Sequence, residues 1–161
     1  MDRPRAEIID TNDPLLLAAQ IEIKSSPRSI FDLLADPAMH SVIDGSGSVQ
    51  RALSGPRRLY LGAKFGMHMK IGIKYRITNT VVEYRENELI GWRHLGRWIW
   101  RYELRELGPN QTEVTESFDG RPSPLQWWLK ARNAYPFTEK AVAKTLVRLK
   151  NFAEEGSSAN Y

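Results

Sequence analysis

Three side chains in the second half of the chain are candidates for moving a proton: His94, Tyr102 and Glu116. They lie in or beside segments in which apolar and polar residues alternate, a pattern typical of half-buried β-strands. If the residues that flank the turn at 108–110 pair with one another, Tyr102 lies opposite Glu116. A carboxyl group on an apolar face has a raised pKa, so Glu116 is a candidate base or a residue that orients a ligand hydroxyl.

A structural role for Glu116 is also open. A carboxylate between apolar neighbours needs a hydrogen-bonding partner, which Tyr102, His94 or the loop around Asp44 would supply. Such a bond would serve to fix the sheet. His94 lies next to a turn, so it is either exposed or an acid or base that needs Glu116 or Tyr102 within hydrogen-bond reach.

Other chemistries are excluded or disfavoured by what the chain lacks. It has no cysteine, so disulfides, thiolate metal sites and cysteine nucleophiles are ruled out. It has no Gly-x-Ser-x-Gly elbow. His40, His68 and His94 lack the close spacing of metal ligands, so we expect no metal and no other cofactor. The loop at 44–48 lacks the Lys-Ser/Thr pair of a phosphate cradle and is expected to be a flexible connection or a mobile loop beside a pocket.

Hairpins at 86–87, 95–97 and 108–110 position these side chains. The predicted strands Glu88–Leu95, Trp98–Glu106 and Gln111–Asp119 give one consistent register, in which Trp92 faces Trp100 and His94 faces Trp98. The remaining predicted pairs are Ile90 with Tyr102, Leu104 with Val114, and Trp100 with Phe118. Because a one-residue slip would invert every side chain, this agreement predicts a single aromatic inner face.

That inner face, with two methionines from 65–71 and one leucine from the terminal helix, gives the candidate ligand-binding residues. They are Met67, Met69, Tyr75, Ile77, Trp92, His94, Trp100, Tyr102, Glu116, Phe118 and Leu149. The register of the strand at 75–84 is left open. A two-residue turn puts Tyr75, Ile77, Asn79 and Val81 inward, whereas a three-residue turn puts Val82 and Tyr84 there; we favour the first.

A helix over Pro136–Ala153 is predicted by proline in its first turn and by an apolar half-circle wider than a two-helix contact needs. Further strands are predicted at Leu15–Lys24, Val49–Leu53, Arg58–Leu61 and Phe65–Ile71, and short helices from Pro27, over Pro37–Ile43 and at 125–130. Alternating strands fill most of the chain before the long helix, so we expect a curved sheet to pack around it.

The 161 residues suit a single domain, 1–161, with a core at about 16–153 and flexible ends at 1–14 and 156–161. The net charge is +4, but no run of five basic residues exists, so nucleic acid is not an expected partner. The arginines that would bind it are Arg57, Arg58, Arg93, Arg101 and Arg105. The chain has no apolar run of about 20 residues and no apolar leader at its start, so a cytoplasmic location is expected.

Four segments carry a family resemblance: Phe31–Pro37, Leu89–Arg93, Trp100–Leu104 and Thr112–Glu116. On these the chain resembles the START-like helix-grip superfamily, in its polyketide cyclase/dehydrase and lipid-transport branch. The resemblance covers about residues 16–153. It implies an α+β helix-grip fold in which a seven-stranded curved antiparallel sheet surrounds a long C-terminal helix, with two short helices after the first strand and a hydrophobic cavity between sheet and helix.

The expected function is therefore binding or carriage of a hydrophobic or aromatic small molecule of lipid or polyketide type. The alternative is a polyketide cyclase/dehydratase-type enzyme that uses His94, Tyr102 and Glu116 for proton transfer, and the sequence leaves catalysis open. Trp127 and Trp128 either pack on the core, cover the pocket mouth or make transient contact with a membrane.

Overall fold

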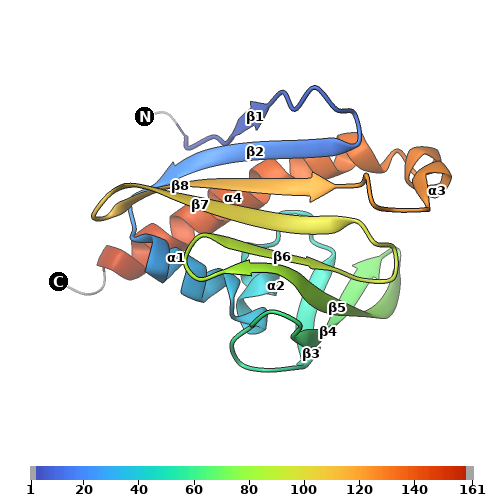
Figure 1. The fold of residues 1–161 in the computed structure, drawn as a ribbon, viewed down its shortest axis with the longest axis horizontal. Coiled ribbons are helices and arrows are strands. Elements are labelled where there is room, and N and C mark those ends of the chain that lie inside the picture. Colours follow the sequence, from blue (N-terminus) through green and yellow to red (C-terminus); the bar gives the residue numbers. More distant parts are fainter. Residues whose placement is uncertain (1–2, 159–161) are drawn as a thin grey trace.

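The computed structural model describes residues 3–158 (Figure 1). Its strands are β1 Glu7–Ile9, β2 Leu16–Ile23, β3 Val49–Ser54, β4 Lys64–Ile71, β5 Ile73–Arg85, β6 Leu89–Arg93, β7 Ile99–Gly108 and β8 Gln111–Asp119. Its helices are α1 Pro27–Leu34, the 3₁₀ turn η1 Pro37–Met39, α2 His40–Ile43, α3 Gln126–Ala131 and α4 Ala134–Ser158. Within the described residues, no helix combines the length and apolar character that crossing a bilayer requires.

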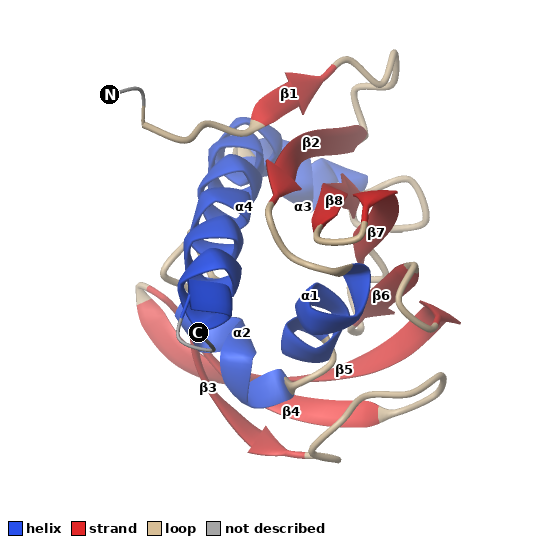
Figure 2. Cartoon of the chain, turned by 90° about the vertical axis from the view of Figure 1, so that its left-hand side faces the viewer, coloured by secondary structure: helices blue, strands red, loops and turns tan. Residues whose placement is uncertain are grey.

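All eight strands form one antiparallel sheet in the order β1-β2-β8-β7-β6-β5-β4-β3. Figure 2 shows the sheet curving around α4, with α1 and α2 on the same side. The predicted α+β architecture is confirmed, with eight strands in place of seven. The extra strand is β1, which lies in the lead-in expected to be flexible and pairs with the edge of β2 through Glu7 and Gln20. Three residues are too few for alternation to reveal a strand.

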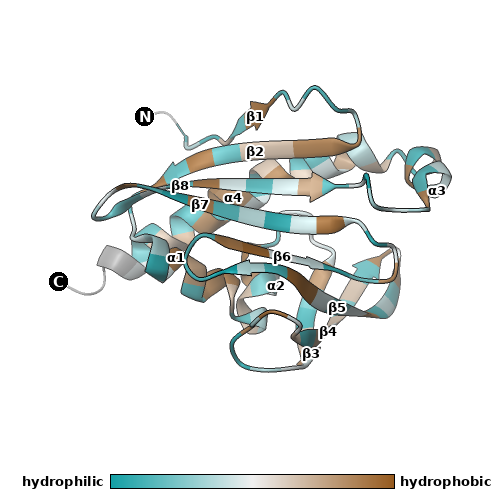
Figure 3. Cartoon of the chain, viewed as in Figure 1, coloured by the Kyte–Doolittle hydropathy of each residue, from teal (hydrophilic) through white to brown (hydrophobic). Residues whose placement is uncertain are grey.

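The predicted register of the last two hairpins is confirmed. Trp92 pairs with Trp100, and Tyr102 pairs with both Ile90 and Glu116. Figure 3 shows hydrophobic and hydrophilic segments alternating along β7 and β8, as a half-buried strand requires. His94 lies just beyond the end of β6, outside the ladder.

The open question about β5 has a two-part answer. The loop to β6 holds three residues, because Arg85 pairs with Leu89, so the favoured two-residue turn was wrong. A register shift between Val81 and Glu83 then places an extra residue in β5. As a result the favoured inward set of Tyr75, Ile77, Asn79 and Val81 is confirmed despite the longer turn. Tyr84 also reaches the core.

The strand predicted at Arg58–Leu61 is absent, and the chain there is a loop. Leu59 is 1% exposed, and its N–H donates to the carbonyl of Ala35 at the end of α1, at 2.7 Å. Tyr60 and Leu61 are exposed. The apolar residues at 58–61 therefore anchor a loop to the end of α1, and the backbone there pairs with no strand.

The helices follow their local signals. Ser26 caps α1 by accepting from the N–H of Ser29 at 3.2 Å, and Pro27 occupies its first turn. α4 begins two residues before Pro136 and continues beyond Ala153 to Ser158. It therefore includes part of the end expected to be flexible, whereas residues 159–161 lie outside the described residues.

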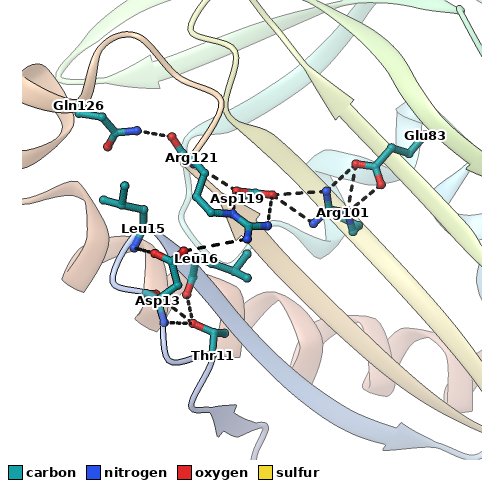
Figure 4. A network of polar contacts seen from close by, with 10 residues as sticks. Thr11, Asp13, Leu15, Leu16, Glu83, Arg101, Asp119, Arg121 and Gln126 are labelled. Carbon is teal, nitrogen blue, oxygen red and sulfur yellow. Dashed lines mark hydrogen bonds and ion pairs between the residues drawn. The ribbon is translucent and has the colours of Figure 1, made fainter.

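A network of ion pairs ties the outer face of the sheet together near α3 (Figure 4). Arg101 on β7 lies between Glu83 and Asp119, with nitrogen–oxygen distances of 2.6 Å and 3.5 Å. Arg121 donates to both Asp119 oxygens, from Nε at 2.9 Å and from a terminal nitrogen at 2.8 Å. The network joins β5, β7 and β8 to the segment that leads into α3, and it reaches across β6, which lies between β5 and β7.

A candidate ligand-binding pocket

A pocket of about 930 Å³ lies between the inner face of the sheet and the first half of α4. All of the candidate ligand-binding residues line it except Leu149. Leu149 has no exposed surface and belongs to the packed core. The reason is its position along α4: the pocket is lined by earlier turns of the helix, including Ala141 and Thr145, whereas the later turns lie on filled core.

Tyr102 and Glu116 form the buried polar pair that the register predicts. The Tyr102 hydroxyl donates to Glu116 Oε1 at 3.0 Å, and the two residues are 4% and 2% exposed. Glu116 Oε2 has no hydrogen-bond partner among the described residues. Burial raises the pKa of Glu116 well above its usual value, and the nearby Asp44 charge adds to this, although the bond from Tyr102 opposes it. Burial therefore favours the protonated, neutral form of Glu116.

The loop around Asp44 does not supply the partner of Glu116. Asp44 Oδ1 accepts from the N–H and hydroxyl of Ser46, and Oδ2 accepts from the N–H of Val49. The neighbouring Gly45 donates to Thr145 Oγ1 on α4 at 2.9 Å. A β-carbon at Gly45 would come within 2.6 Å of the Thr145 nitrogen, so the glycine permits this close approach. Hydrogen bonds thus hold the loop against α4 at the pocket wall.

His40 on α2 lines the pocket and was not among the candidates. Its Nε2 lies 2.9 Å from the carbonyl oxygen of Leu34, which only accepts, so Nε2 carries the proton and Nδ1 is left as an acceptor. The ring stacks on Trp92 at a centroid distance of 4.6 Å. Burial lowers the pKa of His40, against smaller opposing effects of its bond to Leu34 and of nearby carboxylates, so the ring is neutral.

His94 lies at the pocket mouth, apart from Glu116. Its Nδ1 accepts from the N–H of Gly96 at 3.0 Å, and its ring meets Trp98 edge to face at 4.5 Å. Tyr102 and Glu116 share a row of the sheet with Ile90, four residues before His94. At about 3.3 Å per residue, His94 is roughly 13 Å away along the strands. Within residues 3–158 no group of side chains is arranged to hold a metal ion.

Aromatic residues from three elements surround the mouth. Trp98 stacks on Trp128 at 6.0 Å, and the guanidinium of Arg132 lies 4.4 Å above the Trp128 ring. Trp128 therefore packs at the mouth, as one of the sequence interpretations held. Trp127 is 70% exposed and Phe137, at the start of α4, is 57% exposed. The mouth is thus apolar and faces solvent.

No family model matches the chain. Among curated proteins, it is 36% identical over 119 residues to the uncharacterized protein Rv0088 of Mycobacterium tuberculosis. The aligned part is 73% of this chain and 53% of that protein, so the chain spans about half the length of this relative.

Solved structures match nearly the whole chain at low identity. The Polyketide_cyc-like protein Cgl2372 from Corynebacterium glutamicum has a TM-score of 0.58 at 18% identity, covering 91% of this chain and 96% of its own. The Aha1 dimer from Colwellia psychrerythraea has a TM-score of 0.57 at 16% identity, covering 88% and 97%. Structural neighbours of this kind are START-like helix-grip proteins, and the chain has the same helix-grip fold. At these identities the likeness concerns the fold alone.

The candidate list left out the polar side chains of the pocket that lie outside the two confirmed hairpins. These are His40, Asp44, Ser46, Ser48, Asn79, Arg132, Asn133, Thr138 and Thr145. One of the two alternatives for the loop at 44–48 had nevertheless placed it beside a pocket. One signal was available for Asn79, which the favoured register of β5 had already turned inward. His40 had none, because it depends on how a four-residue helix docks against the sheet.

Proposed function

We propose that this helix-grip chain binds a hydrophobic or aromatic small molecule in the pocket and acts as a carrier. The observation that carries the proposal is the hollow itself: about 930 Å³, within the size range of small-molecule sites, and lined mainly by aromatic and aliphatic side chains. Binding would come from removing the apolar surface of the ligand from water, at about 25 cal/mol per Å² before the costs of association.

The electrostatics of the wall disfavour an anionic ligand. Burial favours the neutral forms of Glu116 and His40, and Asp44 is a carboxylate that accepts hydrogen bonds from its own loop. The guanidinium of Arg132 lies at the mouth, stacked on Trp128. A negatively charged group placed deep in the pocket would lose its hydration without gaining a cationic partner.

Replacing Trp100 by alanine is expected to weaken binding of a neutral fluorescent probe such as N-phenyl-1-naphthylamine. Trp100 lines the pocket and meets Phe118 edge to face at 4.9 Å. Loss of its contact with the ligand should cost about 1–2 kcal/mol, a roughly 5- to 30-fold higher Kd. Fluorescence titration measures it, with Trp127→Ala as a control because Trp127 is exposed and does not line the pocket. An unchanged Kd in folded Trp100→Ala protein would refute the proposed site.

The alternative is an enzyme of the cyclase/dehydratase kind. The observation in its favour is the neutral Glu116 next to Tyr102, since a buried acid of raised pKa suits proton donation. The roughly 13 Å between His94 and Glu116 along the strands counts against concerted use of both on one bond. Turnover of a polyketide-like substrate that disappears in Glu116→Gln would favour the enzyme over the carrier.

Nucleic acid is not part of the proposed function, because most of the arginines considered for binding it are paired. Arg58, Arg101 and Arg105 are each paired with a carboxylate. Such pairs reduce the positive potential that a phosphate backbone requires.

We also propose that the mouth contacts membranes transiently through Trp127. This exposed indole lies on α3 beside Lys130, a combination favoured at the lipid–water boundary. Trp127→Ala is expected to reduce co-sedimentation with vesicles of phosphatidylcholine and phosphatidylserine at least threefold, since one buried indole contributes about 1 kcal/mol or more. The matched control is Trp128→Ala, because Trp128 stacks within the protein. Equal sedimentation of wild type and Trp127→Ala would contradict the contact.

A further inference from the structure

The inner end of the pocket contains polar groups that the protein itself does not satisfy. Asn79 on β5 is 4% exposed and lines the pocket, and its side-chain amide makes no hydrogen bond to any residue from 3 to 158. His40 is 6% exposed, and its Nδ1 is an acceptor without a partner in the same range. Both groups line the pocket, so a ligand there can complete their hydrogen bonds.

The two groups lie around one aromatic cluster. Phe65 is the cross-strand neighbour of Asn79, and its ring centroid is 5.5 Å from the ring of His40. Trp92 packs against both rings, at 5.8 Å from Phe65 and 4.6 Å from His40. Asn79 and His40 therefore flank the same aromatic cluster, Asn79 from the sheet and His40 from α2.

The hydrogen-bonding character of the inner end is mixed and uncharged. His40 Nδ1 accepts, whereas the Asn79 amide both donates and accepts. Burial favours the neutral form of Glu116, also at this end; its Oε1 accepts from Tyr102, and its Oε2 has no partner among residues 3–158. A ligand carbonyl would leave His40 Nδ1 unpaired, and a ligand carboxylate would meet neither a cation nor a full set of donors. A hydroxyl group donates once and accepts as well, so it suits both residues.

Building on the pocket's proposed role as a ligand site, we propose that its inner end holds a neutral hydroxyl group of the ligand. The hydroxyl donates to His40 Nδ1 and accepts from the Asn79 amide, while the apolar body of the ligand extends past Trp92 and Trp100 toward the mouth. The ligand class is accordingly a hydroxylated aromatic or polycyclic molecule that enters with its hydroxyl end first.

Three probes of nearly equal shape test this: phenanthrene, 9-methoxyphenanthrene and 9-phenanthrol, each displacing N-phenyl-1-naphthylamine from the wild-type protein. 9-Phenanthrol is expected to bind about tenfold more tightly than phenanthrene, as two net hydrogen bonds of ordinary strength would give. The methoxy compound, which accepts but cannot donate, is expected to show at most a small gain.

Asn79→Leu tests the assignment to a residue, because leucine has a similar size and no polar atom. It should lower the preference for 9-phenanthrol over phenanthrene from about tenfold to about threefold, because the hydroxyl keeps only its bond to His40 Nδ1. The matched control is Thr78→Val, one residue away on β5 with an exposed side chain, which should keep the tenfold preference.

The outcomes separate the two proposals. If none of the three probes displaces the reporter, the pocket is not a ligand site and both proposals fall. If all three bind equally well, or the methoxy compound binds as tightly as 9-phenanthrol, the hydroxyl assignment is wrong while the carrier function stands. The comparison in wild-type protein decides this even if Asn79→Leu does not fold.

Discussion

Replacing Ala141 by tryptophan is expected to abolish probe binding while the protein stays folded. Ala141 lies on α4, lines the pocket and is 7% exposed, so its β-carbon faces the hollow. A tryptophan there would occupy the space of the ligand and bury part of its 150–250 Å² against Trp100 and the other aromatic side chains. We expect the affinity for N-phenyl-1-naphthylamine to fall more than 30-fold.

The same substitution should leave the melting temperature equal or higher, because filling an existing hollow adds contacts without displacing packed atoms. Ala143→Trp is the matched control: it makes the same change in the same helix, two residues away and about 200° around the axis, outside the pocket lining. It should bind the probe like wild type. Full binding by Ala141→Trp would mean that the probe binds elsewhere on the protein.

The parts of this fold that the sequence predicts share one property: their hydrophobic pattern is local. β6, β7 and β8 are joined by short turns, so pairing the flanking residues fixes the register and places Tyr102 opposite Glu116 before any coordinates are known. The helix cap at Ser26 is equally local.

The features that the sequence did not predict depend on contacts between distant segments. The extra residue in β5 brings both Val81 and Tyr84 to the inner side, which strict alternation forbids. β1 forms because β2 has a free edge with which it can pair, and the three residues of β1 give no sequence signal of that pairing. His40 reaches the pocket because α2 docks between the sheet and α4. The hairpin half of the pocket and the long helix α4 were thus predictable, whereas the docking of α2 was not.

Asp119→Asn is expected to cost about 2–3 kcal/mol of unfolding free energy, which makes it a far larger change than most surface substitutions. The Asp119 side chain is 5% exposed and takes hydrogen bonds from Arg121 while lying 3.5 Å from Arg101 (Figure 4). Asparagine keeps the size and removes the charge, so Arg101 retains only Glu83 as a partner in a half-buried position. Urea denaturation at neutral pH measures the difference.

The acid limb of the stability curve gives an independent check. The hydrogen bonds from Arg121 lower the pKa of Asp119, and they outweigh the burial that would raise it. A carboxylate whose pKa is lower in the folded state stabilises it above the unfolded pKa of about 3.9, and this stabilisation is lost as the pH falls through the folded value. The unfolding free energy of Asp119→Asn should therefore be closest to that of wild type at the lowest pH.

A surface pair provides the control for this prediction. Glu113 on β8 pairs with Arg105 at 3.0 Å, but the Arg105 side chain is 69% exposed, so solvent screens the interaction. Glu113→Gln should cost less than about 1 kcal/mol at neutral pH. Equal losses for the two variants would show that the network around Asp119 is no stronger than an exposed ion pair. The difference in unfolding free energy between wild type and Asp119→Asn should become smaller toward acid pH. If it does not, lost packing rather than lost charge destabilises Asp119→Asn.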